Sequence, residues 1–163
     1  MRKTFFIFLL IFIPIILFSQ SDVFILTDTI IINYQQSSLN NNLSKWVEYE
    51  NILKIYEIKK INENKYVGSG YLKYYKFKNY TYGKVDLNFT IIKNNNTVVI
   101  IFYNFKHTSN YISFGNITCI NSQPELKNNK LHPDMYKVLW IDLTEYILLQ
   151  IKIINANIEY FVK

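Results

Sequence analysis

The chain contains few of the residues that staple small folds together or carry out catalysis. Its 163 residues include one cysteine, two histidines, four glycines and three prolines. A single cysteine excludes an internal disulfide framework, so the hydrophobic core must hold the fold together. We expect Cys119 to be a small buried side chain, with a free reactive thiol or an intermolecular bridge as the alternatives.

The histidines and acidic residues form no recognisable catalytic pattern. A zinc site needs three or four ligands at characteristic spacings, whereas His132 and Asp134 supply only two. His107 and Cys119 are separated by an expected loop and carry no signature of a cysteine hydrolase. We therefore predict no catalytic residue, no metal site and no cofactor, and we expect that the protein is not an enzyme. A hydrolase with an unrecognised site is the alternative, because residue spacing does not show spatial geometry.

The N-terminus has the pattern of an export signal. Arg2 and Lys3 precede an apolar run from Phe5 to Phe18, and small or polar residues follow at 19–21. The apolar run is shorter than the roughly 20 residues that a membrane-spanning helix needs. We expect a signal peptide over 1–20 and a single domain over 21–163, with a retained anchor as the alternative. The mature protein would have no stable membrane span and would be periplasmic, at the cell surface or extracellular, in a bacterium.

Basic residues outnumber acidic residues and give the chain a formal charge of +6. This balance favours anionic lipids, polysaccharides or nucleic acids as partners but does not select among them. Export from the cytoplasm argues against nucleic acid. We therefore expect an unidentified protein, glycan or lipid partner at the cell envelope.

Hydrophobic periodicity predicts the order of the secondary structure. The segment from Val85 to Ile91 alternates apolar and polar residues, as a half-buried strand does. Pro133 starts a long C-terminal segment with helical spacing of its apolar residues. The segment 111–120 is either a further strand or an irregular extension. We expect strands over about 22–33, 53–60, 65–78, 85–91 and 97–105, and helices over about 38–52 and from 133 to the mid-150s.

Several positions are predicted to lie in or against the core. Phe89, Ile91 and the run from Val98 to Phe102 should be buried, and the almost wholly apolar last strand should be covered on both faces. Gly68 and Gly70 lie on the same face of one strand. A packed helix or a bend in the sheet would explain the two glycines, and a ligand groove is the alternative.

The segment that begins at Tyr71 is the most aromatic and basic part of the chain. Strand alternation places Tyr71, Lys73 and Tyr75 on one face, and these are our candidate ligand-binding residues. On an open sheet, such rings can stack on sugars or bases while lysine meets phosphate or sulfate. The alternative is cross-strand aromatic pairing that stabilises the sheet, with lysine guarding an edge.

The element order and four segments resemble a known family. The segments are the helix 39–52 with Trp46, the strand Val67-Gly68-Ser69-Gly70, the alternating strand 85–91, and Phe102-Tyr103-Asn104-Phe105-Lys106-His107. With the leader, they resemble the exported bacterial proteins of domain-of-unknown-function family 4468, over about residues 24–154. The resemblance implies a TATA-binding-protein-like fold and export, and it implies no catalytic residue.

Together these features predict an α+β domain in the order β-α-β-β-β-β-α. One curved antiparallel sheet of about five strands would carry two helices packed on one face, which leaves the other face for contacts. The function that we expect is a non-enzymatic binding or interaction module that uses one sheet face. The second hypothesis is a carrier that holds a hydrophobic ligand between the sheet and the C-terminal helix.

Overall fold

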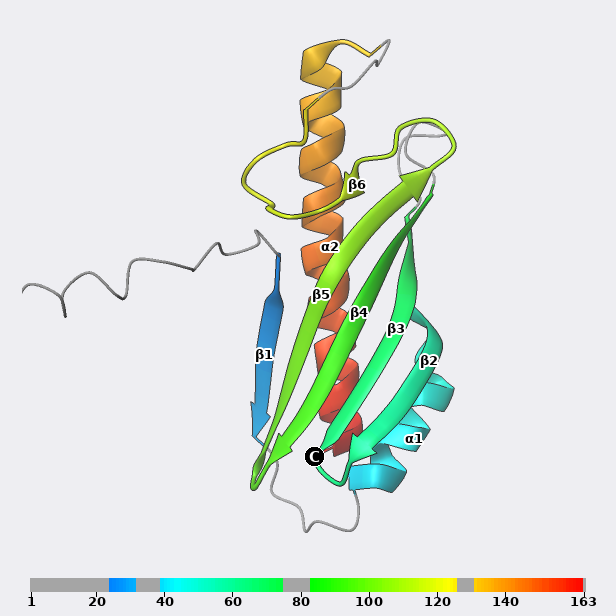
Figure 1. Cartoon of the computed structure of the whole chain (residues 1–163), viewed down its shortest axis with the longest axis vertical. Coiled ribbons are helices and arrows are strands. Elements are labelled where there is room, and N and C mark those ends of the chain that lie inside the picture. Colours follow the sequence, from blue (N-terminus) through cyan, green and yellow to red (C-terminus); the bar gives the residue numbers. More distant parts are fainter. Residues whose placement is uncertain (1–23, 32–38, 75–82, 126–130, 163) are drawn as a thin grey trace, which may run out of the picture.

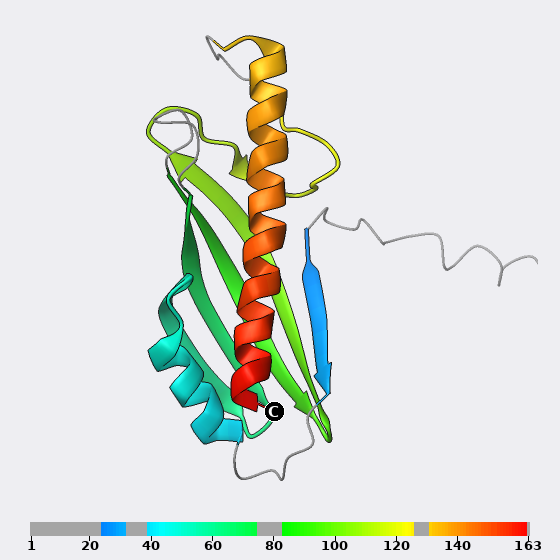
Figure 2. The ribbon, with the colours of Figure 1, turned by 180° about the vertical axis from the view of Figure 1, so that it is seen from behind.

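The structure is a computed structural model and describes residues 24–31, 39–74, 83–125 and 131–162. One antiparallel sheet and two helices form two layers, and both helices lie on the same face of the sheet (Figures 1 and 2). No helix or strand of the described ranges covers the opposite face (Figure 1). We call this uncovered side the open face.

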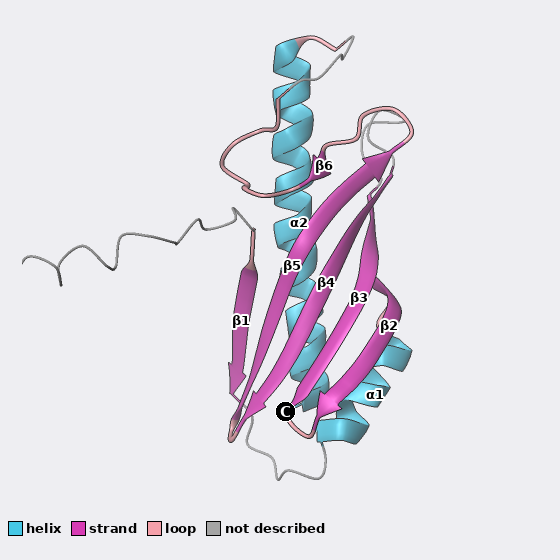
Figure 3. Ribbon diagram, in the orientation of Figure 1, coloured by secondary structure: helices cyan, strands magenta, loops and turns pink. Residues whose placement is uncertain are grey.

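Strands β2 to β5 pair with one another in sequence order, and β1 pairs with the other side of β5. The strands pair antiparallel in the spatial order β1-β5-β4-β3-β2, and the short β6 pairs with the end of β5 (Figure 3). The α+β class and the element order are as predicted from the sequence. The elements are β1 (Leu26–Ile31), α1 (Leu39–Tyr49), β2 (Leu53–Asn62), β3 (Lys65–Tyr74), β4 (Gly83–Asn94), β5 (Thr97–Ser109), β6 (Gly115–Asn116) and α2 (Pro133–Val162).

The core lies between the helices and the covered face of the sheet. Phe89 and Ile91 are fully buried there, as predicted. The Phe89 ring packs edge-on against Trp46 of α1, with the ring centroids 6.1 Å apart. Leu143 and Ile147 of α2 are also fully buried, so both helices contribute apolar side chains to one continuous core.

The prediction that β5 is buried on both faces was wrong. Val98, Ile100 and Phe102 are buried in the core, but Val99 and Ile101 between them are only half-buried. These two side chains lie on the open face, where no helix packs. Apolar and β-branched residues therefore occur on both sides of this strand although only one side is covered.

The C-terminal helix differs from its predicted extent. α2 continues to Val162 rather than ending in the mid-150s, because Ile158 and Val162 extend its buried face. No helix within the described ranges is both long and apolar enough to cross a membrane.

The segment 111–120 is mostly irregular and contains only the short β6, yet Phe114 and Ile117 are buried and close one end of the core. The predicted signal peptide over 1–20 lies outside the described residues. The last part of the predicted strand over 65–78, residues 75–78, also lies outside them.

The two glycines of β3 are explained by core packing. A Cβ atom on Gly68 would lie 2.3 Å from Cζ of Phe89, and one on Gly70 would lie 2.7 Å from the backbone oxygen of Lys54. Both distances are far shorter than van der Waals contact. Glycine at these positions lets the Phe89 ring and strand β2 approach β3 closely, which agrees with packing rather than with a ligand groove.

Glu50 fastens the end of α1 to the start of β2 and to α2. Its Oε1 accepts hydrogen bonds from the backbone N–H groups of Ile52, at 2.8 Å, and Leu53, at 3.1 Å. Its Oε2 accepts from Nε1 of Trp46, at 2.9 Å, and from Nδ2 of Asn157, at 3.3 Å. One carboxylate therefore satisfies four donors where the chain turns from helix to strand.

Replacing Glu50 with glutamine is expected to lower the free energy of unfolding by about 1 kcal/mol. In either orientation the new amide NH2 group would face two donors, either the side chains of Trp46 and Asn157 or the backbone N–H groups of Ile52 and Leu53, and these donors would lose their acceptor. Equilibrium denaturation in urea measures the change. Glu48→Gln, on the exposed side of the same helix, is the control and should change stability by less than about 0.5 kcal/mol. Equal losses in both variants would contradict the role of Glu50 at this junction.

Candidate site on the open face of the sheet

Tyr71 and Lys73 lie on the open face, as strand alternation predicted. Their neighbours Leu72 and Tyr74 are fully buried on the covered face, and alternate residues of a strand point to opposite faces. Tyr71 is half-buried and Lys73 is exposed. Tyr75, the third predicted binding residue, lies outside the described residues. The structure therefore places Tyr71 and Lys73 on the open face, and a binding role for them stays a prediction.

A hydrogen-bonded triangle lies next to Tyr71. The ammonium group of Lys84 donates to Oδ1 of Asp86 and to the hydroxyl oxygen of Tyr56, both at 2.9 Å. The Tyr56 hydroxyl in turn donates to Oδ1 of Asp86, also at 2.9 Å. An ammonium group has three N–H donors, so Lys84 keeps one donor for a further group. We call Tyr56, Tyr71, Lys84 and Asp86 the open-face cluster.

Lys84 is also held by the two aromatic rings of this cluster. Its Nζ lies 5.5 Å from the ring centroid of Tyr56 and 5.6 Å from that of Tyr71. The two rings tilt toward one another, with their centroids 5.2 Å apart. A cation within about 6 Å of a ring is attracted to its electron-rich face. The hydrogen bonds to Tyr56 and Asp86 raise the pKa of Lys84, so this side chain stays positively charged at physiological pH.

Two β-bulges flank the cluster and aim its side chains. In β2, Tyr56 is an extra residue between the pairs Ile55–Gly70 and Glu57–Ser69. In β5, Asn104 and Phe105 together oppose a single residue of β4, and Asn104 has a positive φ of 57°. Bulges bend a strand and redirect side chains, and they are common beside functional sites. The first bulge turns the Tyr56 hydroxyl toward β4, where it reaches Lys84 and Asp86.

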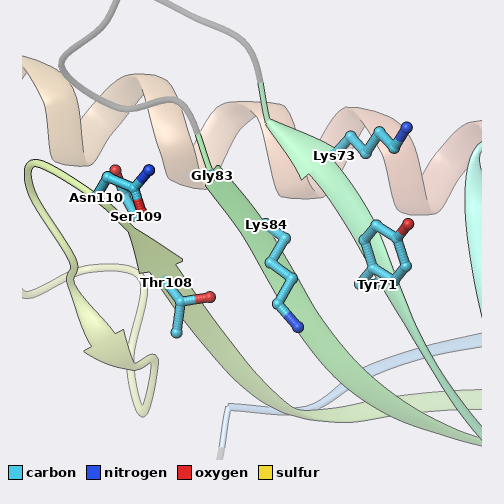
Figure 4. Close-up of a pocket in the computed structure, with 7 residues that line it drawn as sticks. All are labelled: Tyr71, Lys73, Gly83, Lys84, Thr108, Ser109 and Asn110. Atoms are coloured by element: carbon cyan, nitrogen blue, oxygen red, sulfur yellow. The ribbon is translucent and has the colours of Figure 1, made fainter.

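A shallow pocket of about 350 Å³ adjoins the cluster at one end of the open face (Figure 4). Lys84 lies between Thr108 on one side and Tyr71 on the other (Figure 4). Lys73, Lys84 and Thr108 are direct cross-strand neighbours and form one row over three strands. The residues that line the pocket are Tyr71 and Lys73 of β3, Gly83 and Lys84 of β4, and Thr108, Ser109 and Asn110 at the end of β5.

The residues with catalytic potential lie elsewhere. His107 is fully buried, and its Nδ1 accepts a hydrogen bond of 3.2 Å from the backbone N–H of Phe114. His132 is exposed before α2, and its Nδ1 lies 3.4 Å from a carboxylate oxygen of Asp134. Cys119 is half-buried rather than buried as expected. Within the described ranges, no group of three or more His, Cys, Asp or Glu residues is placed to hold a metal.

Sequence analysis missed Tyr56 as a member of the site. Ile55 and Ile58 are three residues apart, and this spacing does not fit the period of two expected of the predicted strand over 53–60. In the structure both isoleucines are partly buried against the core, because the bulge at Tyr56 shifts the alternation by one residue. A change from period two to period three inside a strand is therefore the signal that could have revealed the bulge.

The described chain is a two-layer α+β domain whose uncovered sheet face carries an aromatic and basic site. No protein-family model matches its sequence, and no curated protein matches it either. Among solved structures, the fold is similar to the crystal structure of a DUF4468 family protein from Bacteroides ovatus ATCC 8483. The TM-score is 0.51 and the sequence identity 9%, and the match covers 82% of this chain and 86% of the other. It shows a shared fold and supports the resemblance to family 4468 that the sequence indicated.

Proposed function

We propose that this protein is an exported, non-enzymatic binding module that holds a partner at the cell envelope through the open face of its sheet. The observation that carries the proposal is the position of Lys84. Its ammonium group is fixed by two hydrogen bonds and two aromatic rings on a face that no described element covers.

A fixed lysine differs from an ordinary surface lysine in what it loses on binding. A free lysine side chain has about 2 kcal/mol of conformational entropy, which a partner must overcome when it orders the side chain. In this protein the contacts with Tyr56, Tyr71 and Asp86 already restrict Lys84. Such preorganisation favours binding because less entropy is lost when the complex forms. Cross-strand stabilisation of the sheet is the competing explanation for the same contacts.

Binding to fractions of the host envelope separates these explanations. Envelope protein, polysaccharide and lipid vesicles are immobilised separately, and retention of the purified protein is measured on each. We expect one fraction to retain the wild-type protein. Tyr71→Ala combined with Lys73→Ala should weaken retention by about tenfold, the loss expected when a charge-assisted hydrogen bond and a ring contact disappear.

The matched control removes one lysine and one tyrosine from helix α1, on the opposite side of the sheet from the open face. Lys45 and Tyr49 are exposed on α1, so Lys45→Ala combined with Tyr49→Ala should leave retention unchanged. Both double variants should remain folded in circular dichroism. Equal losses in the two variants would reject the open face as the binding surface. Failure of every fraction to retain the wild-type protein would reject the binding module itself.

The carrier hypothesis has less support from the packing. Trp46, Phe89 and Phe102 are among the large side chains that fill the layer between sheet and helices, and each is at most 1% exposed. A hydrophobic ligand in this layer would have to displace such side chains. The open face therefore remains the better candidate surface.

A further inference from the structure

Two lysines line the pocket on the open face, and their side chains diverge from neighbouring strands (Figure 4). Lys73 and Lys84 are directly opposite residues of β3 and β4. Like charges in this arrangement destabilise a sheet. Asp86 balances the charge of Lys84 at 2.9 Å, whereas the Lys73 ammonium group forms no ion pair with any residue that the structure describes. The pocket thus keeps a positive charge that an anionic ligand would neutralise.

The remaining lining is neutral, polar and aromatic. Thr108 continues the row of Lys73 and Lys84 and supplies a hydroxyl group, and Ser109 and Asn110 add a second hydroxyl and an amide. These groups can both donate and accept hydrogen bonds, which suits a ligand with many hydroxyls. Tyr71 is half-buried at the pocket edge and offers a ring surface.

We propose that this pocket binds an acidic saccharide, with its anionic group on Lys84, the exposed Lys73 side chain turning toward the same group, and a sugar ring against Tyr71. The inference rests on the proposed binding function and specifies the ligand of the same surface. The third N–H of Lys84, which the triangle leaves unused, is available to the anionic group. A volume of about 350 Å³ is at the lower end for ligand pockets, so a short saccharide or a chain end fits better than a large molecule.

Nuclear magnetic resonance titration of the purified protein tests the ligand class. The probes are a tetrasaccharide that contains glucuronic acid, a sulfated tetrasaccharide, a neutral glucose tetrasaccharide, inorganic phosphate and phosphatidylglycerol vesicles. We expect at least one acidic tetrasaccharide to bind about tenfold more tightly than the neutral one, as a charge-assisted hydrogen bond implies. The amide shifts should concentrate at Tyr71, Lys73, Lys84 and 108–110.

Substitutions then separate the roles of the charge and the ring. Lys73→Gln should weaken binding of the acidic tetrasaccharide about tenfold and leave the neutral one unaffected. Tyr71→Leu should weaken binding of the acidic tetrasaccharide, whereas Tyr71→Phe should retain it because the ring surface is kept. Lys45→Gln on α1 removes an equal charge far from the pocket and should change nothing.

Three results would overturn the inference. These are equal affinity for acidic and neutral saccharides, shifts that lie outside the pocket, and binding of phosphate or vesicles alone, which would assign the pocket to a free ion or a lipid headgroup. The proposed function is judged separately. If the Tyr71 and Lys73 variants still lose retention on an envelope fraction while no acidic saccharide binds, only the ligand class is wrong. If retention does not depend on the open face, the proposed function fails as well.

Discussion

Replacing Phe89 with alanine is expected to lower the free energy of unfolding by about 3–5 kcal/mol. The side chain is fully buried and lies between the two layers. It packs edge-on against Trp46, with centroids 6.1 Å apart, and against Phe102, with centroids 6.4 Å apart. Removal of the ring leaves a cavity that these large neighbours cannot fill. Equilibrium denaturation followed by tryptophan fluorescence measures the loss.

The residue next to Phe89 provides the control. Asn88 lies on the open face of the same strand, so Asn88→Ala should change stability by less than about 1 kcal/mol. If Phe89→Ala does not fold, Phe89→Leu should still fold with a smaller loss of stability. Comparable losses at positions 88 and 89 would contradict the assignment of one covered and one open face.

The covered face could be predicted because its side chains obey simple alternation. Val85, Leu87, Phe89 and Ile91 form an unbroken period of two, and all four are buried. The same argument placed Tyr71 and Lys73 opposite Leu72 and Tyr74. Local spacing is sufficient in these strands because no bulge interrupts the pairing between β3 and β4.

The strands with bulges could not be predicted in the same detail. Phe102 and Phe105 are both in the core although they are three residues apart, because the bulge at Asn104 shifts the alternation. Hydropathy alone cannot show which residue of β5 leaves the ladder. It also cannot show that Val99 and Ile101 face away from the helices, because a β-branched residue suits either side of a strand.

The complete pocket depends on the register between strands that are distant in sequence. Tyr71 and Lys73 were identified from their own strand, but Thr108, Ser109 and Asn110 become their neighbours only when β3, β4 and β5 align. Lys73 meets Lys84, and Lys84 meets Thr108, through these pairings. Sequence spacing carries no information about such long-range register, so the aromatic and basic stretch was visible while the polar side of the pocket was not.

Gly68→Ala is expected to lower the free energy of unfolding by about 3 kcal/mol, near the upper end for an added methyl group in a packed core. The new Cβ would lie 2.3 Å from Cζ and 2.8 Å from Cε1 of Phe89, and 2.8 Å from the backbone oxygen of Glu57. The first two contacts force the ring to move. The third requires a shift of strand β2, which side-chain movement cannot supply.

A double-mutant cycle can separate the ring clash from the backbone clash. Phe89→Leu removes Cζ and Cε1, so Gly68→Ala should cost about 1–2 kcal/mol less in that background than in the wild type. Gly70→Ala is the control, because its Cβ would meet the backbone oxygen of Lys54 at 2.7 Å and makes no close contact with Phe89. Its effect should be the same in both backgrounds. If Phe89→Leu relieves the two glycine substitutions equally, the close approach of Phe89 to Gly68 does not explain the glycine, and the general flexibility of β3 would have to explain it instead.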